Sequence, residues 1–390
     1  MTISKLIYLL VVAFGSSTWI GTNSVWMQLS IFTSELPEGW NLPSYLTVVV
    51  QIACIGPLIY TIVHKGCKSV EISHTRLIFA FLALACACQL GLVCFWNDTV
   101  SIGSKRYSLA LYLLLFGLAV VDAMSNVLFM PFMAQFHPAY LNAYFVGMGF
   151  SSLIPSILSL IQGTSAYTCD GDVPHYSPPR FSASIFFLVI FFSTCISAGA
   201  FLTLYMLAVK EWVWVDGQLL SKTSFLLILL IVSIVNAQMN GIIPSISSYA
   251  ALPYSQTTYH LSIALSNIVM PLASFLSFFV VIRELFFLGV LSAISTCSTA
   301  FLVYLAVLSP SMIFNSKTGG GALSISVSLL AAGLHSYLRV AFASRLREGD
   351  RSESRLFWCG VFTQIGSFVG SMVMLIVNLN QVFHSAPPCR

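Results

Sequence analysis

The chain has 390 residues, of which 57% are hydrophobic and only 8% are charged. Soluble globular proteins carry about 25% charged residues, so a water-soluble fold of this size is not expected. The net charge of +4 is spread thinly and forms no basic cluster, which argues against nucleic-acid binding. Apolar runs of about 20 residues, the length of a bilayer-spanning helix, recur along the chain. The composition therefore predicts a multi-pass protein embedded in a lipid bilayer.

The apolar runs, divided where charges, Pro and Gly interrupt them, predict eleven transmembrane helices and an all-α fold. The helices are expected to begin near Ser4, Ser44, Thr75, Tyr107, Ala139, Ser182, Ser224, Thr257, Leu285, Gly321 and Leu356. The first run is too long for the core of a signal peptide and lacks a small-residue cleavage site, so we interpret it as a permanent helix. The longest loop on the outer side, 162–181, is rich in turn residues and is expected to be irregular.

The orientation of the spans is predicted from Lys and Arg, which are enriched in short cytoplasmic loops. With the N-terminus inside, the cytoplasmic segments hold Lys5, Lys65, Lys68, Arg76, Lys210, Lys222, Arg283, Arg345, Arg347, Arg351 and Arg355, against Lys105, Arg106, Arg180, Lys317 and Arg390 outside. The one Asn-x-Ser/Thr site, at Asn97, then falls in an outer loop, where glycosylation takes place. We expect a cytoplasmic N-terminus, an extracellular C-terminus and a glycan on Asn97.

Most of the ten cysteines lie in or beside apolar runs, where free thiols behave as small hydrophobic side chains. Only Cys169 and Cys389 fall in segments expected outside the cell, so one disulfide can form there, with partners that the sequence leaves open. No CxxC pair or His/Cys cluster indicates a metal site. Phosphate-loop, zincin and hydrolase-elbow motifs are also missing from the sequence. These observations favour a solute carrier over an enzyme.

The first span carries Trp19, Asn23 and Trp26 at spacings i, i+4 and i+7, so the three side chains share one helix face. Such a face offers two aromatic surfaces with a carboxamide between them. It can stack on a planar ring and form hydrogen bonds with the edge of that ring. Alternatively, Trp26 belongs to the belt of aromatic residues near the membrane surface.

The fourth span carries Asp122 near its middle and Asn126 one turn further along the same face. Asp122 has three interpretations. The first is a proton-coupling site, the second is part of the wall of a substrate cavity, and the third is a carboxyl group that bonds to a neighbouring helix. Asn126 is expected to line the substrate cavity.

The seventh span carries Asn236, Gln238 and Asn240 ahead of Gly241 and Pro244. Gly and Pro so close together predict a kink, which frees backbone polar groups inside the membrane. Amide side chains beside a broken helix are typical of binding sites in transporters.

Polar residues of the eighth and tenth spans complete the set. His260 and Asn267 share a face of the eighth span, and Tyr259 lies at its outer entrance. For His260, the sequence fits a contact with substrate and a structural role equally well. In the tenth span Arg339, one turn after His335, is expected to extend towards the cytoplasmic surface. The whole set is almost free of charge, which predicts a neutral, flat substrate rich in hydrogen-bonding groups.

Short motifs along the chain resemble the eukaryotic riboflavin transporter family of solute carriers. They are Asn23-x-x-Trp26, Glu35 to Tyr45, Ser125-Asn126-Val127-x-Phe129-x-Pro131-Phe132, Gly147-x-Gly149-x-Ser151, Gln162-Gly163 with Cys169, Asn240-Gly241 with Pro244-Ser245, Leu252-Pro253-Tyr254, Thr258 to Ser262, Ser336-Tyr337-Leu338 and Trp358-Cys359-Gly360. The resemblance extends from the first span to the last. Two positions depart from the family pattern: Met148 stands where Gln is expected in vertebrate relatives, and Asp122 is not part of the pattern.

The resemblance implies riboflavin uptake at the plasma membrane without ATP, sodium coupling or a cofactor, and a monomer is expected to suffice. It also implies an architecture similar to equilibrative nucleoside transporters and major-facilitator proteins. Residues 1–208, with the loop 162–181, are expected to form a six-helix bundle, and residues 224–380 a five-helix bundle. A cytoplasmic linker, 209–223, would join them, and 381–390 would form an extracellular tail.

For riboflavin, the isoalloxazine ring is expected to lie against Trp19 and Trp26, with its polar edge on Asn23 or Asn126. The ribityl hydroxyls are expected to contact polar side chains of spans seven and eight. The side chains expected to make these contacts are Asn240, Tyr259 and Asn267. Two other functions are weighed against this one: a carrier for another flat heterocycle such as a nucleoside, and a membrane receptor that binds its ligand without moving it.

Overall fold

The computed structural model describes residues 4–39, 42–66, 73–103, 105–163, 167–170, 173–176, 178–207, 220–348, 352–380 and 382–384. Contacts within the chain divide it into two compact units. The first consists of Met1–Ala166 and Ser177–Val213, and the second of Tyr167–Tyr176 and Trp214–Arg390. Several expectations fall outside the described residues. They concern the side chain of Cys169, Cys389, and most of the linker 209–223 and of the tail 381–390.

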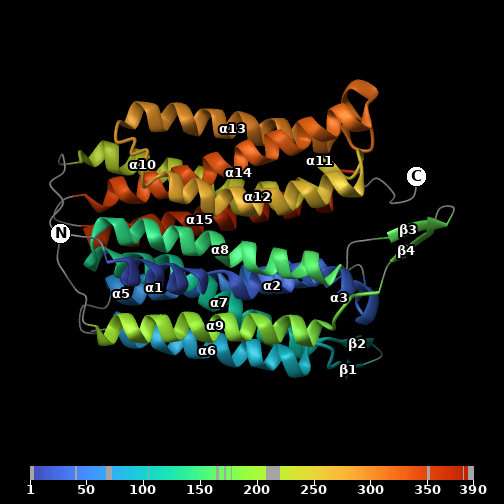
Figure 1. Cartoon of the computed structure of the whole chain (residues 1–390), viewed down its shortest axis with the longest axis horizontal. Coiled ribbons are helices and arrows are strands. Elements are labelled where there is room, and N and C mark those ends of the chain that lie inside the picture. The colour runs from blue at the N-terminus through green and yellow to red at the C-terminus, as the bar shows by residue number, and fades with distance from the viewer. Residues whose placement is uncertain are drawn as a thin grey trace. The chain divides into compact units, whose positions relative to one another are not determined.

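The first unit contains six membrane spans (Figure 1). Its helices are α1 (Lys5–Ser16), α2 (Ile20–Met27), α3 (Leu29–Glu35), α4 (Leu42–Ala53), α5 (Ile55–Gly66), α6 (His74–Phe95), α7 (Leu109–Phe132), α8 (Pro138–Gln162) and α9 (Ala183–Met206), with a short 3-10 turn, η2 (Met133–Gln135), after α7. The first span consists of α1 and α2, which are bent by 53° at the break between them. Helices α4 and α5 together form the second span.

The second unit contains five spans among its described residues, and a π-helical turn interrupts the α-helical pattern of the first of them. Its elements are α10 (Lys222–Ala237), the π-helical turn η3 (Gln238–Ile242), α11 (Ile243–Ala251), α12 (Gln256–Leu276), α13 (Leu285–Leu308), the 3-10 turn η4 (Ile313–Asn315), α14 (Lys317–Arg347) and α15 (Ser352–Leu379). Helices α12 and α14 pack side by side, as do α10 and α15.

Among the described residues, ten helical segments are long and apolar enough to cross a membrane, and the bent pair α1–α2 makes an eleventh span. The prediction of an all-α protein with eleven spans is therefore confirmed. The last two helices begin about one turn earlier than expected, at Lys317 and Ser352. For α14 the reason is an N-cap, because the Ser316 hydroxyl accepts a hydrogen bond from the Gly319 amide.

The expectation of an irregular loop over 162–181 was wrong. The strands β3 (Tyr167–Asp170) and β4 (Val173–Tyr176) pair there as an antiparallel hairpin. The local sequence accounts for it, because Asp170-Gly171 between two runs containing Tyr, Thr and Val is a hairpin signal. A second hairpin, β1 (Val100–Ile102) and β2 (Lys105–Tyr107), turns at Gly103, whose positive φ favours glycine. The hairpin β3–β4 groups with the second unit, whereas the sequence-based division assigned the loop to the first bundle.

Aromatic packing and close helix contacts hold the first unit together. Phe14 of α1 packs on Phe129 and Phe201, at ring-centroid distances of 5.0 and 4.9 Å. Helix α1 approaches α8 so closely that a Cβ on Gly147 would lie 2.1 Å from the carbonyl oxygen of Val12. Small residues at such contacts are typical of helix pairs in membranes.

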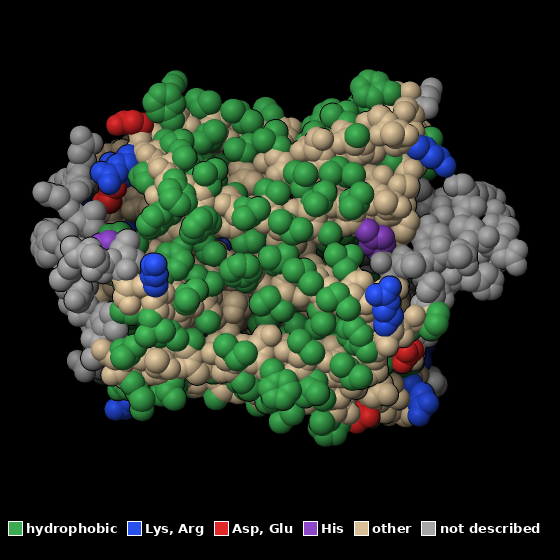
Figure 2. Space-filling view, in the orientation of Figure 1, with side chains coloured by type: hydrophobic (Ala, Val, Ile, Leu, Met, Phe, Trp, Pro, Cys, Tyr) green, Lys and Arg blue, Asp and Glu red, His purple; other side chains and the backbone are tan. Residues whose placement is uncertain are grey.

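The flanks of both units are apolar. Figure 2 shows hydrophobic side chains over the flanks of the helices, with most Lys, Arg, Asp and Glu near the helix ends. Large apolar side chains are exposed there, for example Leu113, Ile196, Leu226 and Phe286, which are between 61% and 75% exposed. Exposed apolar surface on this scale marks a lipid-facing protein. The chain is therefore a multi-pass membrane protein.

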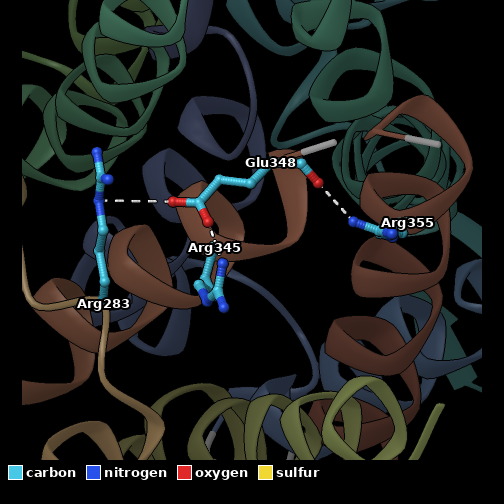
Figure 3. Close-up of polar contacts among 4 residues, drawn as sticks. All are labelled: Arg283, Arg345, Glu348 and Arg355. Atoms are coloured by element: carbon cyan, nitrogen blue, oxygen red, sulfur yellow. Dashed lines mark hydrogen bonds and ion pairs between the residues drawn. The ribbon is translucent and has the colours of Figure 1, made fainter. Parts of the chain in front are cut away.

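Charged side chains meet at one end of the second unit (Figure 3). Glu348, just after α14, forms ion pairs with Arg345 and with Arg283 of the α12–α13 linker. Its backbone oxygen accepts a hydrogen bond from Arg355 of α15. The three arginines are residues that the charge count assigns to the cytoplasm, and the structure brings them together around one residue, Glu348.

Candidate functional site

The first span is interrupted because hydroxyl side chains compete for its backbone. Ser16, Ser17 and Thr18 each donate a hydrogen bond to the carbonyl oxygen three residues earlier, at 2.7–2.9 Å. Such local bonds bend helices. Helix α1 ends at Ser16 and α2 begins at Ile20, so Trp19 lies at the break.

The three residues predicted to share a face of the first span, Trp19, Asn23 and Trp26, are half-buried, while most of their neighbours are fully buried. Asn23 donates from Nδ2 to the carbonyl oxygen of Ser151 on α8, at 3.3 Å. Trp26 packs at the side of an apolar cluster in the same unit. The face therefore stays partly accessible, as a substrate-binding surface requires.

Asp122 has a defined partner at this break. Its Oδ2 accepts a hydrogen bond from the backbone amide of Thr22, at 3.0 Å, and the side chain is only 1% exposed. The first amides of a helix have no partner within that helix, and Thr22 belongs to the first turn of α2. Asp122 therefore caps α2 from α7. Of its three interpretations, this geometry favours the bond to a neighbouring helix.

Two other residues of the pattern are buried inside the first unit. Asn126 is 3% exposed, one turn after Asp122 on α7. Met148 is 6% exposed on α8, so the position where we expect Gln in vertebrate relatives presents a thioether instead of an amide. Asn97 is exposed in the turn after α6, where a glycan has room.

Where the sequence predicts a kink in the seventh span, the structure has the π-helical turn η3. Gln238 is 5% exposed and donates from Nε2 to Thr296 Oγ1, at 2.9 Å. Its Oε1 lies 2.9 Å from His335 Nε2 and 3.4 Å from Thr299 Oγ1. Gln238 thus connects the turn with α13 and α14. Turns of this kind occur frequently at functional sites.

The other side of the turn rests on α15. Asn240, which is half-buried, donates from Nδ2 to Ser367 Oγ at 2.9 Å. A Cβ on Gly241 would lie 2.5 Å from backbone atoms of Gly370 and Ser371, so only glycine allows this approach. The amide side chains of the seventh span therefore point to different neighbours, Gln238 to α13 and α14 and Asn240 to α15.

The residues predicted on the eighth span all lie on α12. His260 Nε2 is 2.7 Å from Gln256 Nε2 on the same helix, and its ring contacts Tyr259 at a centroid distance of 5.6 Å. Tyr259, His260 and Asn267 are half-buried. Arg339 of α14 places Nη1 3.7 Å from Met239 Sδ, so its guanidinium reaches the π-helical turn.

The predicted site residues fall into two sets. Trp19, Asn23, Trp26, Asp122 and Asn126 belong to the first unit. Asn240, Tyr259, His260 and Asn267 belong to the second. The contact of His335 with Gln238 was not predicted, because the spacing of residues along one helix gives no information on its partner in another.

Comparisons with known proteins place these features in a family. A family model described as solute carrier family 52, riboflavin transporter, matches residues 3–214 and 210–385. The Caenorhabditis elegans riboflavin transporter rft-1 is 56% identical and covers 98% of both chains. The human solute carrier family 52 riboflavin transporter member 3 is 33% identical, over 99% of this chain and 98% of its own.

Among solved structures, the major facilitator superfamily transporter FucP in its outward conformation is similar in fold. The TM-score is 0.58, with 13% sequence identity, and the match covers 98% of this chain and 94% of FucP. The expected major-facilitator-like fold is thus confirmed.

Proposed function

Because the chain belongs to solute carrier family 52, the riboflavin transporters, we propose that it carries riboflavin across the membrane by alternating access. Membership in a family of transporters agrees with the expectation of a protein that is not an enzyme. The two units of helices supply the two halves that alternating access requires.

One observation carries the proposal: the first span of each unit is interrupted, at Ser17–Trp19 in one and at Gln238–Ile242 in the other. Interrupted helices at corresponding places in the two halves of a transporter are the best structural indication of its binding site. In the first unit the interruption comes directly before Asn23 and Trp26, and in the second it carries the amide side chains of Gln238 and Asn240.

The chemistry of the first set suits the isoalloxazine ring. This flat tricycle can stack on indole surfaces, and each aromatic pair contributes about 0.5–1.5 kcal/mol beyond buried area. Its uracil-like edge alternates acceptors with one N–H donor, which a carboxamide can match. We assign the ring to Trp19 and Trp26 and its polar edge to Asn23 or Asn126.

The second set suits the ribityl chain. Its hydroxyls lose water on binding and then need partners. Asn240 and Asn267 supply carboxamides, and Tyr259 supplies a phenol. Asn240 is held by Ser367, and a carboxamide has three further hydrogen-bonding positions for a ligand. His260 is assigned to the same surface as a weaker contact.

The remaining parts of the proposal concern location and energy source. We place the protein in the plasma membrane with its N-terminus in the cytoplasm and its C-terminus outside, acting as a monomer. Transport is independent of ATP and sodium. The charge count, the exposed Asn97 and the absence of a phosphate-loop motif from the sequence support these assignments.

Uptake of labelled riboflavin by cells expressing the protein tests the proposal. We expect saturable uptake that excess flavin analogues inhibit and excess nucleosides do not. Inhibition by nucleosides instead of flavins would indicate a carrier for other heterocycles. Binding of riboflavin without accumulation would indicate a receptor and contradict the proposal.

A further inference from the structure

Gln238 occupies the start of the π-helical turn, and its orientation follows from the hydrogen bonds around it. The Thr296 hydroxyl donates its one hydrogen to the carbonyl oxygen of Ser292, at 2.9 Å. Its oxygen can then only accept, so the Gln238 atom that faces it, at 2.9 Å, is the amide nitrogen. The amide oxygen of Gln238 consequently faces His335.

This orientation defines the role of His335 Nε2. The ring nitrogen lies 2.9 Å from Gln238 Oε1, and a carbonyl oxygen can only accept. His335 therefore carries a hydrogen on Nε2 and donates it to Gln238. The imidazole is 0% exposed and Gln238 is 5% exposed, so water does not compete for this bond. Without the His335 donor, the buried amide oxygen of Gln238 would lose a hydrogen-bond partner.

The same turn carries Asn240, two residues after Gln238. Gln238 attaches the turn to α13 and α14, and Asn240 attaches it to Ser367 of α15. Gly241 presses the turn against α15 on the side of Asn240. Loss of the bond to His335 would therefore weaken one of the attachments of the turn from which Asn240 projects.

We propose that His335 is a positioning residue for the substrate, which acts through Gln238 to hold the π-helical turn and the carboxamide of Asn240 in place. The inference rests on the proposed function, because it requires Asn240 to contact riboflavin. His335 itself does not touch the substrate. Its effect is on affinity, transmitted along the path His335, Gln238, turn, Asn240.

Four variants and the kinetics of riboflavin uptake, corrected for the amount of protein at the surface, test the inference. His335→Leu removes the donor and should raise KM about 3- to 10-fold, the factor expected for one buried hydrogen bond. His335→Gln places an N–H donor at a similar reach and should return KM to within about twofold of the wild type. Gln238→Leu should raise KM like His335→Leu, and the double variant should be no worse than either single one, because both changes break the same contact.

Ser336→Ala is the matched control. Ser336 is the next residue on α14, and it bonds to Met270 and Ser274 of α12 instead of the π-helical turn. Its loss should reduce the amount or thermal stability of the protein while KM stays unchanged. An unchanged KM in His335→Leu, or no recovery of KM in His335→Gln, would overturn the inference and leave the proposed function intact. A wild-type protein that takes up no riboflavin would overturn both the inference and the proposed function.

Discussion

Asn23 and the two tryptophans beside it form the part of the molecule best suited to a planar heterocycle. The three side chains are half-buried in a region where Thr22, Ser24 and Val25 are fully buried. A hydrogen bond to Ser151 limits the orientation of the Asn23 carboxamide. The spacing along the helix predicts that the three side chains share one face, because helical periodicity depends only on local sequence, whereas the break at Trp19 could not be predicted in this way.

Replacing Asn23 or Trp26 by Ala should therefore lower riboflavin uptake strongly, by about tenfold or more, while surface expression stays near normal. A polar ligand edge loses its partner in the first variant, and a stacking surface is lost in the second. Uptake and surface biotinylation measured together give the result. Asn380→Ala, which removes an exposed amide bonded only to the carbonyl of Ile376, serves as control. Wild-type uptake in both site variants would refute the assignment.

Asp122 illustrates a role that the sequence left open between three alternatives. Its bond to the Thr22 amide explains why an acid is present in the membrane, since the bend in the first span exposes that amide. No position along the sequence indicates this contact, because residues 22 and 122 are joined only by the packing of α2 on α7.

Asp122→Asn should retain most of the uptake, with the pH dependence of the wild type, because the amide oxygen of Asn still accepts from Thr22. Asp122→Leu cannot accept a hydrogen bond and should lose folded protein or uptake. The measurement is riboflavin accumulation with and without an acid-outside gradient. If Asp122→Asn abolished gradient-driven accumulation but preserved exchange of riboflavin, Asp122 would be a coupling site and the cap would not explain its function.

At the scale of elements, the interruptions of spans one and seven differ in how far they could be predicted. Gly241 and Pro244 indicated the second, because both residues disturb helices. The first had no such signal. It depends on Ser16, Ser17 and Thr18 bonding back to their own helix, and hydroxyl residues do this only in some helices. The hairpin β3–β4 was missed although Asp170-Gly171 indicates it, because the loop was judged by its overall composition.

The loop between α3 and α4 is tied to α7 by one carboxylate. Glu38 accepts hydrogen bonds from the Ser108 amide at 2.6 Å, the Ser108 hydroxyl at 2.8 Å and the Tyr112 hydroxyl at 2.7 Å. Burial opposes ionisation, but the bonds from Tyr112 and Ser108 outweigh it and hold the pKa of Glu38 below its ordinary value. The folded protein therefore stabilises the ionised form of Glu38 over its protonated form.

A carboxyl group whose pKa is lower in the folded state than in the unfolded state stabilises the folded state. The full contribution is present at pH values above the unfolded pKa, which is about 4.3 for Glu. It is lost as the pH falls through the folded pKa. Glu38→Gln should therefore lower the melting temperature of the purified protein at pH 7. The difference from the wild type should shrink below about pH 4. Thermal unfolding followed across pH gives the result, and a difference that stays constant with pH would contradict the role of the charge.

At the scale of the whole molecule, hydropathy alone was sufficient to predict eleven spans, because a bilayer imposes the length and polarity of each helix. The eleven spans divide between two units, six in the first and five in the second. Contacts between spans could not be predicted in this way, since every span is apolar and hydropathy does not distinguish one partner from another. The pairing of α1 with α8 across Gly15 and Gly147 is an example.

An odd number of spans predicts that the two termini lie on opposite sides of the membrane, and this is testable. Enzymatic deglycosylation should change the gel mobility of the wild type and not of Asn97→Gln, because Asn97 is the one acceptor sequence in the chain. A tag at the C-terminus should be accessible to antibody in intact cells. A tag that is accessible only after permeabilisation would contradict the orientation.

The central claim, that the protein carries riboflavin and that Asn23 and Asn240 contribute to its binding, is tested most directly by counterflow. Purified protein is reconstituted into liposomes loaded with unlabelled riboflavin, and labelled riboflavin is added outside without ATP, sodium or a pH gradient. The account predicts transient accumulation of label above its outside concentration in vesicles with the wild type, and much less with Asn23→Ala or Asn240→Ala. Label that binds to the vesicles in proportion to protein but never exceeds the outside concentration in their lumen would contradict it.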